Sequence, residues 1–175
     1  TLMDVWVQKH CGLLFDGNGR WASKGKIVGA LLEACLTDPY FKRKPPKSTG
    51  REYFNENWLL ERFPLLPSLN PEDVQRTLIA LTAQGILSAI AQTQPDTKEL
   101  FVCGGGALNP LLMQELQKGP YGVFSTSVLG VDPMHVESMA FAWLAYRFAN
   151  KKAGNLPAVT RARGERILGA LYPAY

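Results

Sequence analysis

The sequence predicts an α/β fold in which an incomplete sheet of parallel strands is covered by helices. The second half of the chain alternates strand signals with helix signals, an order typical of right-handed α/β units. Helical segments outnumber strand segments along the whole chain, so we expect part of the sheet to be missing. In order, the signals are an apolar run at residues 99–103, a glycine turn at 104–106, a helix from 109, an apolar run at 121–127 and a helix from Asp132 to about Phe148.

The first half is predicted to be helical, with one long connection. Apolar residues recur at helical spacing in residues 2–10 and 26–36. A third helix should begin at Asn70 and Pro71, because asparagine caps free N–H groups and proline fits the first helical position. Residues 38–57 are polar and rich in proline, and a loop of that length in a compact domain is usually functional or flexible.

Composition narrows the class of protein. The 175 residues are 46% hydrophobic and 19% charged, which suits one globular unit. The longest apolar stretch, residues 139–146, is far shorter than the roughly 20 residues that cross a bilayer, and no leader opens the chain, so we expect neither a membrane partner nor secretion. Three widely spaced cysteines match neither a disulfide framework nor a zinc site, which favours the reducing cytoplasm and predicts no metal centre.

The charge pattern gives little support for nucleic-acid binding. Part of the net charge of +4 comes from one segment, residues 42–51, and a nucleic-acid binder would show a longer basic stripe. Within that segment, residues 47–52 mix cations, hydroxyls and a glycine. This composition suits the binding of phosphate or carboxylate, and it fits a solvated basic loop equally well.

The glycine turn is the most informative local feature. Gly104, Gly105 and Gly106 lead from a strand into a helix, where backbone without Cβ atoms can approach a ligand and N–H groups can face an anion. This pattern is typical of a nucleotide contact. A tight turn that needs positive φ explains the three glycines equally well. An N-cap role explains Asn109 fully.

Glu137 is the candidate acid of the last predicted helix. Its neighbours one and two turns on are apolar, so its carboxylate should lie beside a cleft or form an ion pair, because burying it alone is costly. His135 is expected to be a surface or capping group, and Trp143 and Tyr146 are expected to be core residues. The sequence pattern suggests no partner for the carboxylate of Asp16.

Five ordered blocks resemble one family, the C-terminal half of bacterial anhydro-N-acetylmuramic acid kinases. The similarity runs along essentially the whole chain, and coincidence across five blocks in the same order is very improbable. The blocks are residues 2–6 (LMDVW), 47–55 (KSTGREYFN), 102–113 (VCGGGALNPLLM), 137–145 (ESMAFAWLA) and 154–160 (GNLPAVT).

The resemblance implies an actin-like (ribonuclease H-like) ATPase fold of two domains around an ATP cleft. Such enzymes use ATP and Mg²⁺ to open the 1,6-anhydro ring and phosphorylate O6, giving N-acetylmuramic acid 6-phosphate in peptidoglycan recycling. It implies that Gly104, Gly105, Gly106 and Asn109 bind the nucleotide and that Glu137 lies on the sugar side as a catalytic carboxylate. The family's main catalytic base is expected in an Asp-Thr-Gly-Pro-Gly-Asn stretch upstream of Leu2.

Residues 1–175 are therefore expected to be the C-terminal half of a two-domain kinase, with the N-terminal domain and the upstream strands absent. The chain opens with Thr1 rather than methionine, as expected of a piece of a longer protein. Alone it should be inactive, with the missing half as its partner, and the resemblance leaves a homodimer open. Arg161 stands where the family pattern has glycine, which puts any ligand contact at that turn in question.

Two other readings compete with a kinase. Actin-like scaffolds host several functions, so a non-enzymatic nucleotide-binding regulator on the same fold is the first. The second is a helical interaction module whose basic loop binds an acidic partner.

Overall fold

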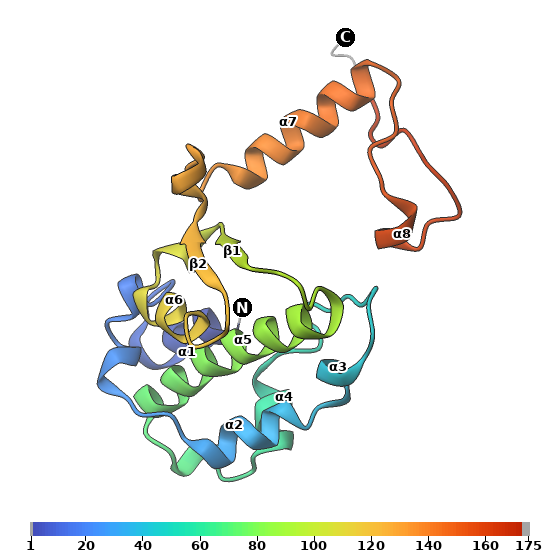
Figure 1. Cartoon of the computed structure of the whole chain (residues 1–175). Coiled ribbons are helices and arrows are strands. Elements are labelled where there is room, and N and C mark those ends of the chain that lie inside the picture. The colour runs from blue at the N-terminus through green and yellow to red at the C-terminus, as the bar shows by residue number, and fades with distance from the viewer. Residues whose placement is uncertain (1, 173–175) are drawn as a thin grey trace.

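The structure is a computed structural model that describes residues 2–172; Thr1 and residues 173–175 lie outside the described part. Within these residues, helices dominate, and two short strands interrupt them late in the chain (Figure 1). Short 3-10 turns join several of these elements. The helices are α1 (Leu2–Cys11), α2 (Gly29–Leu36), α3 (Pro39–Lys42), α4 (Glu56–Arg62), α5 (Pro71–Thr93), α6 (Pro110–Leu116), α7 (Val136–Ala149) and α8 (Pro157–Thr160), and the strands are β1 (Glu99–Val102) and β2 (Gly122–Ser125).

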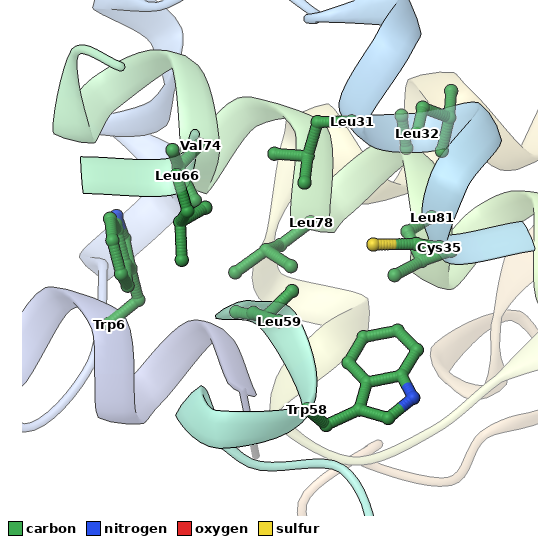
Figure 2. Packing of buried hydrophobic residues seen from close by; sticks show 11 residues of the cluster. Trp6, Leu31, Leu32, Cys35, Trp58, Leu59, Leu66, Val74, Leu78 and Leu81 are labelled. Carbon is green, nitrogen blue, oxygen red and sulfur yellow. The ribbon is translucent and has the colours of Figure 1, made fainter. Parts of the chain in front are cut away.

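Helix α5 is the centre of the molecule. It packs against α1, α2, α3 and α6, so it joins helices from both halves of the chain (Figure 1). Its larger hydrophobic cluster joins Val74, Leu78 and Leu81 of α5 to side chains from α1, α2 and α4 (Figure 2). Among those partners, Trp6 also donates its indole N–H to the carbonyl of Pro71 at 2.8 Å. The first turn of α5 is thereby fixed to α1.

A second, smaller cluster joins α5 to the strand region. Ile79 and Ala83 of α5 contact Leu112 and Leu116 of α6, and Val123 of β2 completes the cluster. Leu78 and Ile79 are adjacent in sequence and belong to different clusters, because successive helical residues are about 100° apart around the axis.

The sheet has two parallel strands among the described residues. Glu99 pairs with Gly122 and Val102 with Ser125, and α6 forms the crossover between the two strands. This β-α-β unit confirms the predicted α/β class and the parallel strands. The predicted strand intervals 99–103 and 121–127 contain the observed strands, which are shorter at their ends.

Helix α7 extends away from the rest of the chain (Figure 1), and none of its residues is buried by the described part. The prediction that Trp143 and Tyr146 are core residues is wrong here, since they are 51% and 57% exposed. Arg147 lies over the Trp143 ring at 5.3 Å and donates from Nε to the carbonyl of Ala153 at 2.7 Å. The helix is therefore held at its C-terminal end to the segment that follows it.

Several predicted boundaries differ from the observed ones. The helix expected over residues 26–36 begins at Gly29, and the last long helix begins at Val136 rather than at Asp132. The carboxylate of Asp132 accepts the N–H of Met134 at 2.8 Å and so closes a turn ahead of the helix. The side chain of Asn70 makes no capping hydrogen bond, although α5 does start at Pro71 as predicted.

By length and composition, α5 could cross a membrane, and it is the one described helix that meets both criteria. Of its most apolar 18-residue window, 44% is buried inside the structure. Gln75 and Thr77 are buried in this helix, and Arg76 forms an ion pair with Glu115 of α6. These packed polar groups favour a core helix.

Candidate functional site

The predicted glycine turn forms between β1 and α6. Gly104 has φ +74°, a left-handed conformation that favours glycine, and Gly105 begins a 3-10 turn that ends at Leu108. The N–H of Gly104 donates to the carbonyl of Pro133 at 2.8 Å. The turn is thus anchored to the segment that leads into α7.

Gly105 faces open space. A Cβ atom built on Gly105 would meet no heavy atom within 4 Å, whereas one on Gly106 would come within 3.2 Å of Leu112. Within residues 2–172, the N–H groups of Gly105 and Gly106 find no acceptor, as is usual for the first residues of a helical turn. The turn therefore presents two backbone donors beside unfilled volume.

Asn109 caps helix α6. Its Oδ1 accepts the N–H groups of Leu111 at 3.1 Å and Leu112 at 3.3 Å, which confirms the N-cap role. A contact between Asn109 and a ligand stays a prediction. A Cβ on Gly19, whose φ is +66°, would lie 2.7 Å from this oxygen, so the loop before Gly19 packs directly against the cap.

Asp16 shapes that loop. Its two carboxylate oxygens accept the N–H groups of Trp21 at 2.8 Å and Ala22 at 2.9 Å. The expectation that Asp16 lacks a partner is therefore wrong. The sequence did contain a signal for these hydrogen bonds, because Asp16 opens a glycine-rich stretch. In such turns, an aspartate commonly accepts backbone N–H groups a few residues on.

Glu137 lies in the first turn of α7 and is exposed. Within the described part of the chain, its side chain forms neither a hydrogen bond nor an ion pair, so the structure does not bring the carboxylate beside the predicted cleft or give it a partner. Its helix face is apolar as predicted but uncovered, with Phe141 64% exposed. His135 is exposed, which agrees with its predicted surface position.

A buried carboxylate organises the long polar connection. Asp38 is fully buried and accepts hydrogen bonds from three groups and an ion pair from a fourth. Burial alone would raise the pKa of Asp38, but these partners outweigh it and hold the pKa below its usual value. The partners are the indole Nε1 of Trp58 at 2.8 Å, the backbone N–H of Tyr40 at 2.8 Å, the hydroxyl of Tyr53 at 2.9 Å and the guanidinium of Arg62 at 2.8 Å.

This connection also contains helix α3 and the start of α4, which the sequence did not predict. Asn55 caps α4 by accepting the N–H of Trp58 at 3.0 Å, and this asparagine ahead of an aromatic and aliphatic pair was the missed signal. Lys47 donates to the carbonyls of Tyr40 at 3.0 Å and Phe41 at 3.3 Å. In the predicted anion-binding segment, Lys47 therefore has a structural role.

Neither a metal centre nor a disulfide forms in the described chain. No three His, Cys, Asp or Glu side chains gather within residues 2–172 in a way that could hold an ion. All three cysteines are free thiols, and burial raises the pKa of the Cys35 thiol to about 12. Cys11 and Cys103 are exposed.

Comparison with known proteins gives a consistent result. The family model described as anhydro-N-acetylmuramic acid kinase matches residues 1–174. Proteins named anhydro-N-acetylmuramic acid kinase from Burkholderia orbicola (strain MC0-3), Burkholderia cenocepacia and Burkholderia mallei (strain ATCC 23344) are 49%, 48% and 48% identical to the chain over 179 residues. Each alignment covers 99% of this chain and 47%, 47% and 46% of the respective relative, so the chain spans about half the length of the relatives that it matches. The chain belongs to the anhydro-N-acetylmuramic acid kinase family.

Proposed function

We propose that the full-length protein phosphorylates 1,6-anhydro-N-acetylmuramic acid with ATP and opens the anhydro ring hydrolytically, giving N-acetylmuramic acid 6-phosphate for peptidoglycan recycling. Membership of the kinase family supports this proposal. The structural observation that supports it is the open glycine turn. We further propose that this chain is the C-terminal half of a cytoplasmic two-domain enzyme with an actin-like fold. The parallel β-α-β unit is compatible with that fold.

The glycine turn is the proposed nucleotide side of the site. The free N–H groups of Gly105 and Gly106 can donate to a phosphate oxygen, and the missing side chain of Gly105 leaves room for close approach. Asn109 holds the start of α6 behind the turn and so fixes the direction of these donors.

ATP, when bound, supplies the phosphoryl group, and Mg²⁺ neutralises the charge on its phosphates. The described residues bring together no carboxylate cluster for the metal, so we assign none of them to Mg²⁺. The contribution of this chain is to position the phosphates, since positioning and charge stabilisation together account for most of the catalysis of phosphoryl transfer.

Glu137 is the proposed catalytic carboxylate on the sugar side. Its exposure and its freedom from partners within the described chain leave the carboxylate available to accept a hydrogen bond or a proton from a sugar hydroxyl. The bond from Gly104 to Pro133 fixes the backbone four residues before Glu137 to the nucleotide side. We expect the main base in the half of the protein that precedes this chain.

The deciding experiment is an assay of the full-length protein with ATP and 1,6-anhydro-N-acetylmuramic acid, with the product identified by mass spectrometry. A product heavier than the sugar by one phosphoryl group and one water supports the proposal. Tight ATP binding without any product would point instead to a nucleotide-binding regulator. Binding of an acidic protein without any effect of ATP would point to an interaction module.

A further inference from the structure

A cavity of about 310 Å³ lies between α1, α5 and the basic segment. Its walls are largely apolar, and its polar side chains are few. Sites of this size and composition, with a few polar groups to set orientation, are typical for small ligands or for parts of larger ones. The lining residues are Leu2, Met3, Phe41, Thr49, Gly50, Arg51, Phe54, Leu78, Leu81 and Thr82.

Among the described residues that line this cavity, Arg51 is the only cation. No carboxylate of residues 2–172 forms an ion pair with it, in contrast to Arg62 and Arg76, which pair with Asp38 and Glu115. The nearest acid in sequence, Glu52, folds back over Gly50 and does not pair with Arg51. Arg51 therefore offers an exposed, unpaired guanidinium beside an apolar cavity.

The wall that carries Arg51 is built by packing around the buried carboxylate. Tyr53 bonds to Asp38, and Phe54 packs edge-on against Trp58 with ring centroids 4.8 Å apart. Phe54 also packs against Phe41, another lining residue, with ring centroids 5.8 Å apart. These contacts fix the backbone on the C-terminal side of Arg51, so the Cα atom from which the Arg51 side chain extends is held in place.

We propose that this cavity recognises the lactyl group of the muramic acid substrate, with the lactyl carboxylate on Arg51 and the lactyl methyl group against the apolar wall. This inference rests on the proposed function. Muramic acid differs from glucosamine by a lactyl ether whose carboxylate is ionised at neutral pH. Arginine presents a planar pair of donors that matches a carboxylate, and the unpaired guanidinium of Arg51 lacks such a partner within the described chain.

The test compares two sugars on the full-length protein, 1,6-anhydro-N-acetylmuramic acid and 1,6-anhydro-N-acetylglucosamine, which lacks the lactyl group. The wild-type protein should prefer the acid. Arg51→Gln should raise KM for the acid at least tenfold, because a charge-assisted pair is lost, and should leave KM for the neutral sugar unchanged. The KM of Arg51→Lys for the acid should lie between those of the wild type and Arg51→Gln, since lysine keeps the charge but lacks the paired donors.

Arg43→Gln is the matched control. Arg43 is an exposed arginine of the same connection that does not line the cavity, so its removal changes the net charge equally and should not alter the preference. Glu52→Gln should act in the opposite direction and lower KM for the acid, because a negative charge beside the cavity is removed.

Equal effects of Arg51→Gln on both sugars, or a wild-type protein without preference for the acid, would overturn the inference. A lowered melting temperature with unchanged preference would also overturn it, and would show that Arg51 has a structural role. If neither sugar is phosphorylated, the proposed function fails, and calorimetric binding of the two sugars still tests the role of Arg51. If Arg51→Gln abolishes the tighter binding of 1,6-anhydro-N-acetylmuramic acid in that experiment, the proposed role of Arg51 is supported.

Discussion

The backbone N–H of Gly104 donates a 2.8 Å hydrogen bond to the carbonyl of Pro133. This bond joins the glycine turn to the segment that leads into α7, across 29 residues of sequence. Pro133 is buried, so the bond is shielded from water. The backbone segments that carry the proposed nucleotide donors and the proposed sugar-side carboxylate are therefore joined by this hydrogen bond.

Replacement of Gly105 by valine should lower ATP affinity of the full-length protein at least tenfold. A Cβ atom at this position meets no heavy atom within 4 Å, so the fold should survive, and the β-branched side chain should occupy the space proposed for the nucleotide. Isothermal titration with ATP measures the effect. Gly29→Val is the control, because a Cβ on Gly29 also meets no atom within 4 Å, and it should leave ATP affinity unchanged. An unchanged titration of a folded Gly105→Val protein would remove the glycines from the site.

Glu137→Gln should lower turnover on the order of 10²-fold and leave ATP affinity nearly intact, since the carboxylate is proposed to handle a hydrogen bond or proton at the sugar. The melting temperature should not change, because Glu137 has no partner within the described chain. Steady-state kinetics and thermal melting of the full-length protein separate these effects. Normal turnover with a melting point several degrees lower would show that Glu137 is structural.

Asp38→Asn should lower the free energy of unfolding by about 3 kcal/mol, because Arg62 would keep its charge beside a buried neutral group. Tyr53→Phe removes a single hydrogen bond to the same carboxylate and should cost about 1 kcal/mol. Denaturant titration of the full-length protein measures both. Equal costs for the two variants would contradict the central role of Asp38.

The stabilising effect of Asp38 should also depend on pH. Its pKa is lower in the folded protein than in the unfolded chain, so the unfolded chain binds more protons near the ordinary aspartate value of about 4. The contribution is full above that value and is lost as the pH falls through the folded pKa. The difference in stability between wild type and Asp38→Asn should therefore be constant near neutral pH and shrink below about pH 4. Denaturant titrations at several pH values test this, and a difference that persists unchanged into strong acid would contradict it.

Residues 1–175 expressed alone should self-associate and show no kinase activity. Large apolar side chains of α7 and of the segment after it are exposed, and such surfaces favour association. Adding the N-terminal half of the protein should restore solubility before activity, because docking covers these surfaces whereas phosphoryl transfer also needs accurate placement. Sedimentation analysis measures the association, and a monodisperse monomer that melts cooperatively would contradict the expectation. Phosphoryl transfer by this chain alone would place the catalytic base within it.

The features of the fold that could be predicted from the sequence are those with a local signal. The start of α5 at Pro71, the two strands and the cap at Asn109 depend on residues within one turn of each other, and the structure confirms them. The match to the family also followed from local blocks. Roles for Gly104 to Gly106 and Glu137 stay predictions, since a ligand contact involves atoms beyond these local patterns.

Other features of the fold depend on long-range contacts, which the sequence does not show. The apolar face of α7 predicted burial of Trp143, but periodicity does not reveal which surface covers a face. Asn55 is a local signal for the start of α4, but the contact that holds α4 in the fold joins Asp38 to the indole of Trp58, 20 residues later. A pairing between distant residues leaves no periodic pattern in the sequence.

The position of α5 between two clusters makes its length critical. A single inserted residue in the middle of the helix would turn every later side chain by about 100° around the axis. Side chains such as Leu81 and Ala83 would then leave their own clusters together, because each cluster draws on a different side of the same helix. Substitutions in α5 can act on one cluster at a time, whereas insertions and deletions act on both. The helix should therefore accumulate conservative replacements and keep a constant number of residues among functional relatives.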